Sequence, residues 1–243
     1  MRRSLVLVSL LICSVSWLVI YGKEDETKTF KPTNGLFSDK FVNSDSLDFT
    51  QNKNIPEIIR KEVIEALSHY PELAETPIDF VFRKDIIKSF MQAQPKWYGI
   101  FQGKKKRRYI VKITPALKLK NKSIPIEELP TDALVGWFGH ELGHIMDYKN
   151  RSGFALLRFG IGYMTSEKYL MKAEQRADLY AINHHLGSEI LSTKHFILDH
   201  AQIPLAYKER IRRLYMSPEE VMEIIDADDS FLPIEDEIED DEL

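Results

Sequence analysis

Residues 131–150 read TDALVGWFGHELGHIMDYKN, and this stretch decides how the rest of the chain is interpreted. Its apolar residues cover nearly every side of a helix, which predicts a buried helix from Thr131 to about Asn150. His140 and His144 are four residues apart, so both imidazoles can point at one metal ion. Glu141 lies one residue round from His140 and can reach a water on that metal. An exposed helix with two surface histidines is the alternative, and the apolar flanks argue against it.

A second motif, Glu174-Gln-Arg-Ala-Asp178, follows thirty residues after His144. It falls in a predicted helix from about Ser166 to Gly187, where Glu174 and Asp178 share a face one turn apart. Glu174 can then reach the metal, and Asp178 can accept a hydrogen bond from the outer nitrogen of a ligating histidine. The alternative is a solvated helix face. Two nitrogen ligands, one oxygen ligand and an open fourth position are typical of a catalytic zinc site.

The two motifs together resemble the gluzincin metallopeptidases. The resemblance covers about residues 129–186, and it is strongest to the branch with a Glu-x-x-Ala-Asp second motif, which includes the CAAX prenyl endopeptidases and the minigluzincins. It implies a zincin-like fold and a zinc-dependent endopeptidase, with His140, His144 and Glu174 as zinc ligands, Glu141 as general base and Asp178 hydrogen-bonded to a ligand. The membrane-embedded members have several spanning helices, whereas this chain has at most one candidate, so the soluble branch fits better.

The expected reaction is hydrolysis of a peptide or protein substrate by a metal-activated water, with Glu141 as the proton acceptor. A further donor has to stabilise the oxyanion, and the sequence leaves several candidates open. They are Tyr163, His195, His200, Tyr207 and Arg210. The alternative function is a membrane-anchored, non-catalytic protein that retains a structural metal site.

His184 and His185 are not expected at the metal. His185 shares the face of Glu174, but eleven residues place it about 16 Å further along the helix axis. A capping or surface role near Gly187 is the better interpretation for both histidines.

The remaining patterns predict an α+β, helix-rich domain with a small antiparallel sheet before the motif helix. A helix begins at Pro56, Ile78–Phe82 forms a strand, and Trp97–Phe101 pairs with Tyr109–Ile113 around a basic tip. The resemblance implies that the second of these hairpin strands lines the cleft and pairs with substrate, and the alternative is an interior strand with no substrate role. Residues 114–130 are expected to form a loop. Short helices follow at about residues 192–200 and 204–215, and Ser217-Pro218 begins the last helix.

Three glycines, Gly136, Gly139 and Gly143, lie on one face of the motif helix. Each costs about 1 kcal/mol relative to alanine in a helix interior, so a packing reason is expected. The sequence therefore predicts that a strand or a helix approaches this face closely.

The N-terminus predicts a membrane segment. Arg2 and Arg3 precede the apolar run Leu5–Tyr21, so residues 1–22 are interpreted as a signal-anchor or a signal peptide. The two arginines favour the cytoplasmic side, which places the catalytic domain outside the cytoplasm. The alternative is a secreted or periplasmic protein after signal cleavage. Residues 23–54 are expected to be a flexible linker, and 55–226 the metallopeptidase domain.

The distribution of charge and the single cysteine bear on the C-terminal tail, on a nucleic-acid partner and on two kinds of cysteine-based site. The 243 residues include 33 basic and 37 acidic side chains, and ten of the acidic ones lie in residues 226–243, so 227–243 is predicted to be an acidic disordered tail. The rest of the chain is only mildly basic, which does not require a nucleic-acid partner. The single cysteine, Cys13, excludes a disulfide framework and a cysteine-ligated zinc site.

Overall fold

A computed structural model describes residues 48–86, 89–100, 103–227 and 234. The predicted N-terminal membrane segment, most of the predicted linker and nearly all of the acidic tail lie outside these residues. Phe49, which belongs to the predicted linker, is described and is buried. Within the described ranges, none of the helices has the length and apolar composition needed to cross a membrane.

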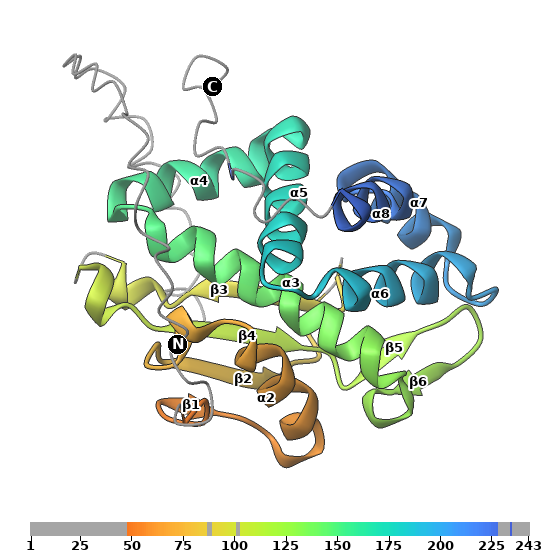
Figure 1. Ribbon diagram of the computed structural model, residues 1–243, viewed down its shortest axis with the longest axis horizontal. Coiled ribbons are helices and arrows are strands. Elements are labelled where there is room, and N and C mark those ends of the chain that lie inside the picture. The colour runs from red at the N-terminus through yellow and green to blue at the C-terminus, as the bar shows by residue number, and fades with distance from the viewer. Residues whose placement is uncertain (1–47, 87–88, 101–102, 228–233, 235–243) are drawn as a thin grey trace, which may run out of the picture. The chain divides into compact units, whose positions relative to one another are not determined.

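A four-stranded sheet, ordered β1-β2-β4-β3, forms the lower layer in Figure 1. Its strands are β1 (Lys53–Asn54), β2 (Ile78–Phe82), β3 (Met91–Pro95) and β4 (Tyr109–Ile113). The first two run parallel to β4, whereas β3 is antiparallel to it and forms one edge of the sheet. In β4, Tyr109, Val111 and Ile113 are buried and alternate with half-buried residues, because successive side chains point to opposite faces of a strand.

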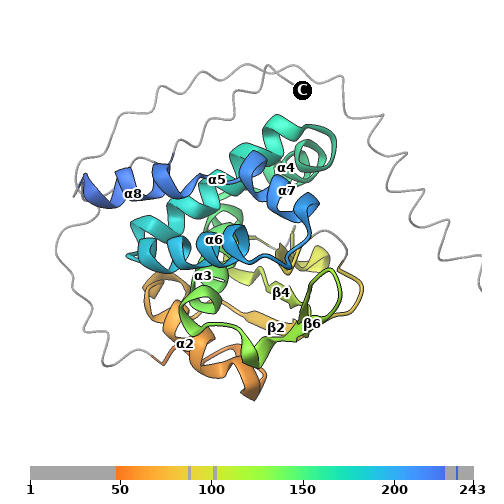
Figure 2. The same ribbon diagram turned by 90° about the vertical axis from the view of Figure 1, so that its right-hand side faces the viewer.

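The helices pack around α3 (Thr131–Asn150). The others are α2 (Arg60–Ser68), α4 (Gly153–Thr165), α5 (Glu167–Asn183), α6 (Gly187–Asp199), α7 (Leu205–Leu214) and α8 (Pro218–Asp226). Helix α3 contacts the sheet, where the rings of Phe138 and Phe80 meet edge to face at 6.0 Å. Figure 2 shows α5 and α6 on the side of α3 away from the sheet. Both sides of α3 are therefore covered, which explains why nearly all of its residues are buried.

The glycines of α3 allow α5 and α6 to approach it closely. A Cβ atom added at Gly136 would lie 2.1 Å from the carbonyl oxygen of Glu189 in α6, and one at Gly143 would lie 2.5 Å from that of Ala177 in α5. At Gly139 the added atom would meet the side chain of Leu186 at 2.6 Å. The predicted close approach is confirmed, and both neighbours are helices.

The predicted α+β, helix-rich domain with a small sheet before the motif helix is confirmed. The strand predicted at Trp97–Phe101 is wrong, because Trp97–Gly99 forms a 3-10 turn and Met91–Pro95 is the partner of β4. Residues 91–95 have weak strand propensity, and it is pairing with β4 that makes them a strand. Pro95 is tolerated there because β3 is an edge strand.

Three other boundaries differ from the prediction. The expected loop at residues 114–130 contains an antiparallel ribbon of β5 (Ala116–Lys118) and β6 (Ser123–Pro125). The helix expected to reach Gly187 ends at Asn183, and Gly187 begins α6 instead. Helix α4 was not predicted. Its N-cap is Ser152, whose side chain accepts a hydrogen bond from the backbone of Ala155.

Candidate metal centre

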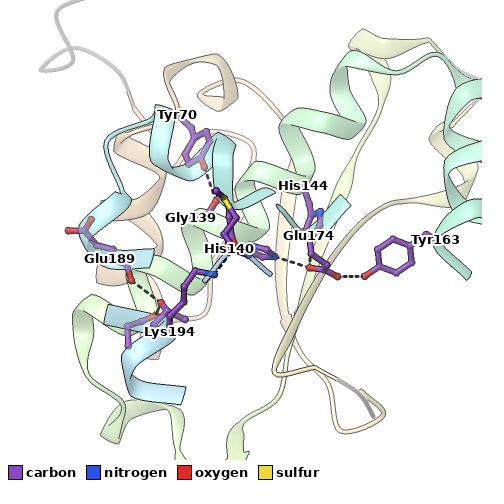
Figure 3. Close-up of polar contacts among 12 residues, drawn as sticks. Tyr70, Gly139, His140, His144, Tyr163, Glu174, Glu189 and Lys194 are labelled. Atoms are coloured by element: carbon purple, nitrogen blue, oxygen red, sulfur yellow. Dashed lines mark hydrogen bonds and ion pairs between the residues drawn. The ribbon is translucent and has the colours of Figure 1, made fainter. Parts of the chain in front are cut away.

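Three buried side chains from two helices meet in the middle of the domain (Figure 3). His140 and His144 project from α3, and Glu174 projects from α5. The Nε2 atom of His140 lies 3.1 Å from Oε2 of Glu174, and Nε2 of His144 lies 3.3 Å from the same oxygen. The three side chains are at most 7% exposed. The two sequence motifs are thus brought together as neighbouring faces of crossing helices.

The donor set fits a metal ion. All three potential ligand atoms lie within 4.8 Å of one another. In a tetrahedral site with bonds of about 2.0–2.1 Å, neighbouring ligand atoms are separated by about 3.3 Å. The two nitrogen–oxygen distances of 3.1 and 3.3 Å are close to that separation. The arrangement can therefore hold a metal ion through two imidazole nitrogens and one carboxylate oxygen.

Asp178 fixes the orientation of His140. Its Oδ1 lies 2.9 Å from Nδ1 of His140, and because an ionised carboxylate only accepts hydrogen bonds, that nitrogen is the donor. The Nε2 atom of His140 is then left without a proton when the ring is neutral, as a metal ligand must be. The other carboxylate oxygen of Asp178 accepts hydrogen bonds from Nζ of Lys194 at 2.7 Å and from the backbone of Met216 at 3.2 Å.

His144 is positioned differently from His140. Its Nδ1 atom is buried and has no hydrogen-bond partner among the residues that the structure describes. Its ring instead stacks on Tyr148, with the ring centroids 5.9 Å apart and the planes 10° from parallel. Packing therefore orients this imidazole, whereas a hydrogen-bonded carboxylate orients the other.

Glu141 lies beside the cluster and faces the edge of the sheet. Its Oε2 accepts a hydrogen bond from the backbone N–H of Ala93 in β3, and the side chain is 5% exposed. Burial raises the pKa of Glu141, and the neighbouring imidazoles of His144 and His140 oppose that rise. A carboxylate whose pKa is raised toward neutrality is better matched to accept and release a proton.

The other charged groups of the cluster shift one another's pKa. Burial alone would lower the pKa of His140, but hydrogen bonds to Asp178 and Glu174 raise it to about 10. Burial alone would raise the pKa of Glu174, yet hydrogen bonds from the two imidazoles hold it well below its usual value. Burial also opposes ionisation of Asp178, but Lys194 and His140 lower its pKa. The cluster without a metal is therefore a network of ions, and a metal has to displace a proton from it.

The five candidate oxyanion donors lie in different surroundings. Tyr163 of α4 donates its hydroxyl to Oε1 of Glu174 at 2.7 Å, as Figure 3 shows. Tyr207 lines a pocket beside His140 and Glu141, and burial raises the pKa of Tyr207 although the charge of Arg210 opposes that rise. His195 is about half exposed and its nearest charged partner is Asp199, so it does not face the cluster. His200 ends α6 and accepts a hydrogen bond from the backbone of Gln202.

The pocket beside the cluster has an apolar and aromatic lining, with His140 and Glu141 in its wall. The other lining residues are Ser89, Phe90, Met91, Trp137, Asp178, Ile190, Thr193, Lys194, Ile197, Tyr207, Ile211 and Tyr215.

The structure tests the expectations for strand β4 and for the two histidines at the end of α5. Strand β4 lies between β2 and β3, so the expectation that it presents a free edge to substrate is wrong. The edge beside Glu141 belongs to β3. His184 and His185 lie at the end of α5, where the ring of His184 stacks on Tyr70 at 4.2 Å, so neither belongs to the metal cluster.

Lys194 and the backbone of Ala93 were missed by the sequence interpretation. Lys194 is buried and 16 residues from its partner Asp178 in the chain, on a different helix. Nothing in its local sequence distinguishes it from a surface lysine.

A comparison of the chain with protein families, with curated proteins and with solved structures finds no match in any of the three.

Proposed function

We propose that this protein is a zinc-dependent endopeptidase. The observation that carries the proposal is the convergence of two imidazole nitrogens on one carboxylate oxygen, with a buried glutamate beside them that is not one of the three ligands. Two nitrogens and one oxygen from the protein, with further positions left for water and substrate, are the ligand set of catalytic zinc sites. The two motifs and their spacing support a place among the gluzincins, in the soluble branch.

The residues of the chain have separate tasks in this proposal. Zinc held by His140, His144 and Glu174 would polarise the scissile carbonyl and lower the pKa of a bound water. Glu141 accepts the proton of the attacking water at its carboxylate and passes it to the leaving amine. Asp178 keeps the proton of His140 on Nδ1, with Lys194 holding Asp178 ionised. Tyr163 holds the second oxygen of Glu174 and is the candidate donor nearest to a ligand.

The edge of β3 supports a peptide as substrate. The N–H of Ala93 points out of the sheet to Glu141 instead of pairing with β4, so backbone groups of an edge strand lie next to the proposed base. An extended peptide can add to such an edge by main-chain hydrogen bonds. The catalytic domain, in this proposal, acts outside the cytoplasm and is tethered to the membrane by residues 1–22.

Metal content and cleavage of the purified full chain test the proposal. We expect about one zinc per chain, cleavage of unfolded casein, and loss of both in His144→Ala. Glu127→Gln, an exposed position outside the cluster, serves as the control and should change neither. Stoichiometric zinc retained by His144→Ala would contradict the ligand assignment. Bound zinc without cleavage of any unfolded substrate would instead favour the non-catalytic, structural metal site.

A further inference from the structure

The outer face of α4 is apolar and exposed. Phe154, Leu157, Ile161 and Met164 are 63%, 45%, 43% and 78% exposed. Their spacing of three and four residues places them along one stripe of the helix. Helix α4 contains no acidic residue, and Arg158 is its only charged one. A contiguous exposed stripe of large apolar side chains differs from single exposed residues, which need no explanation.

A basic and aromatic loop lies against the end of α3, where α4 begins. Trp97 is 81% exposed and Tyr98 is 47% exposed. Lys104 donates a hydrogen bond to the carbonyl of Asn150, and Arg107 donates to that of Arg151 at 3.1 Å. The described residues 96–100 and 103–108 include six basic residues and no acidic one, and Lys104, Lys105 and Lys106 are exposed. We call this segment and the α4 stripe together the α4 face.

The chemistry of the α4 face matches the surface of a bilayer. Interfacial helices combine a stripe of Phe, Leu or Trp with flanking lysines, which meet anionic headgroups. Exposed tryptophan and tyrosine are enriched at the level of the headgroups. The chain also begins with the apolar run Leu5–Tyr21, and residues 22–47, fully extended, could span about 85 Å, enough for the domain to turn any face toward a membrane.

We propose that the α4 face docks the folded domain on a membrane surface that contains anionic lipid. Phe154, Leu157, Ile161 and Met164 enter the boundary between headgroups and acyl chains, with Trp97 beside them, and the lysines of the loop contact lipid phosphates. This contact is separate from the predicted N-terminal segment, which tethers the chain but does not orient the domain. It does not depend on the metal or on the proposed peptidase activity.

Docking through α4 would place the metal centre close to the lipid. The opposite side of the same helix carries Tyr163, whose hydroxyl bonds the carboxylate of Glu174. Only the thickness of one helix, about 10–12 Å, separates the apolar stripe from that ligand. Together with the proposed peptidase activity, on which this step alone rests, the orientation would favour protein segments near the membrane as substrates.

The fluorescence of Trp97 in full-length Trp17→Phe protein tests the proposal. Trp137 is buried between Phe90 and Phe196, so we expect its fluorescence to stay constant when vesicles are added. The variant Trp97→Phe, made in the same Trp17→Phe background, measures this contribution of Trp137. With vesicles of phosphatidylcholine and phosphatidylglycerol, we expect brominated lipid to quench Trp97 and aqueous acrylamide to quench it less than without vesicles. Leu157→Gln/Ile161→Gln should lower the docking equilibrium constant more than about tenfold, because two large apolar side chains no longer enter the lipid.

Matched variants separate docking from a general effect of substitution. Leu205→Gln/Met222→Gln changes two residues of α7 and α8 with similar exposure, which lie across α5 from α4 in Figure 1, and should leave lipid quenching unchanged. Lys105→Gln/Lys106→Gln should weaken quenching at low salt, whereas Lys118→Gln/Lys120→Gln in the β5–β6 region should not. Circular dichroism confirms that each variant is folded.

Several outcomes would overturn the proposal. The first is quenching of Trp97 by acrylamide to the same extent with and without vesicles, with no quenching by brominated lipid. The second is an equal loss of lipid quenching in both apolar double variants. Sedimentation without lipid gives the third test, because a parent dimer that Leu157→Gln/Ile161→Gln converts to a monomer would show that a second copy covers the α4 face.

Discussion

Lys194 donates a hydrogen bond to Asp178 at 2.7 Å, and both side chains are at most 4% exposed. The second oxygen of Asp178 accepts the bond from His140, so a cation on α6 is linked through one carboxylate to an imidazole of the candidate metal cluster on α3. A buried carboxylate without a cation would be strongly unfavourable. Lys194 therefore keeps Asp178 ionised and able to hold the Nδ1 proton of His140.

Replacing Lys194 tests this link. We expect Lys194→Met to lower the free energy of unfolding by up to about 3–5 kcal/mol, because it removes one of the two cations that pair with the buried carboxylate of Asp178. Zinc affinity should fall about tenfold or more, since Asp178 then holds His140 less well. Lys208→Met, which removes a half-buried lysine bonded to the carbonyl of Leu198, is the control and should leave zinc affinity unchanged. Equal zinc affinity in parent and Lys194→Met protein would show that the ion pair is structural only.

Asp178→Asn should weaken zinc binding by about 10–100-fold, the usual effect of losing a carboxylate that orients a ligand. The amide can still contact His140 but no longer stabilises its proton on Nδ1 by charge. Competition with a fluorescent chelator gives the affinity. In the double variant Lys194→Met/Asp178→Asn the losses should be less than additive, because the neutral amide does not need the cation. Fully additive losses of zinc affinity would mean that Lys194 and Asp178 act independently, which would contradict the link between them.

Glu141→Gln should retain zinc and lose about 10²–10⁴-fold in kcat, because glutamine cannot accept the proton. The amide oxygen can still accept the hydrogen bond from Ala93, so the local structure should persist. Cleavage of casein and metal content are measured on the same sample. Activity within tenfold of the parent would mean that another group is the base or that this site does not catalyse the reaction.

Zinc binding should release a proton near neutral pH. Without a metal, hydrogen bonds to Asp178 and Glu174 raise the pKa of His140 to about 10, despite burial. At pH 7 that imidazole is protonated, so zinc has to displace a proton, and affinity should rise with pH by up to about tenfold per unit. Calorimetry between about pH 6 and 8, in two buffers of different ionisation enthalpy, gives the number of protons released. Zinc affinity that does not change with pH would contradict a protonated His140.

Gly136→Ala should destabilise the fold, because the added Cβ would lie 2.1 Å from the carbonyl oxygen of Glu189 and 2.3 Å from the hydroxyl of Thr193. Overpacking of this kind costs about 1–3 kcal/mol, or at least about 2 °C in Tm for a domain of this size. Gly160→Ala in α4 is the matched control. No atom lies within 4 Å of its added Cβ, so helix propensity should raise Tm slightly. A similar Tm for both variants would contradict close packing at Gly136.

Local sequence patterns predicted the motif helix, the residue types of the candidate metal cluster and much of the apolar core. Helical spacing places His140 with His144, and Glu174 with Asp178, on one face of each helix, so each pair could be predicted from the sequence. That the two pairs meet depends on how α3 packs against α5. The strands at 78–82 and 109–113 and the start of the last helix at Ser217-Pro218 followed from local patterns as well. These features depend on neighbours within one or two turns, so the chain records them directly.

Only the tertiary structure decided which side chains complete the site. Lys194, Tyr163 and the edge at Ala93 belong to three elements that meet around α3 through packing, and no local pattern marks a lysine as buried or a weak strand as an edge. Helix α4 escaped prediction because its apolar residues face both the core and solvent. The same physical reason applies throughout: contacts between residues distant in the chain depend on how whole elements pack, and short-range periodicity does not encode them.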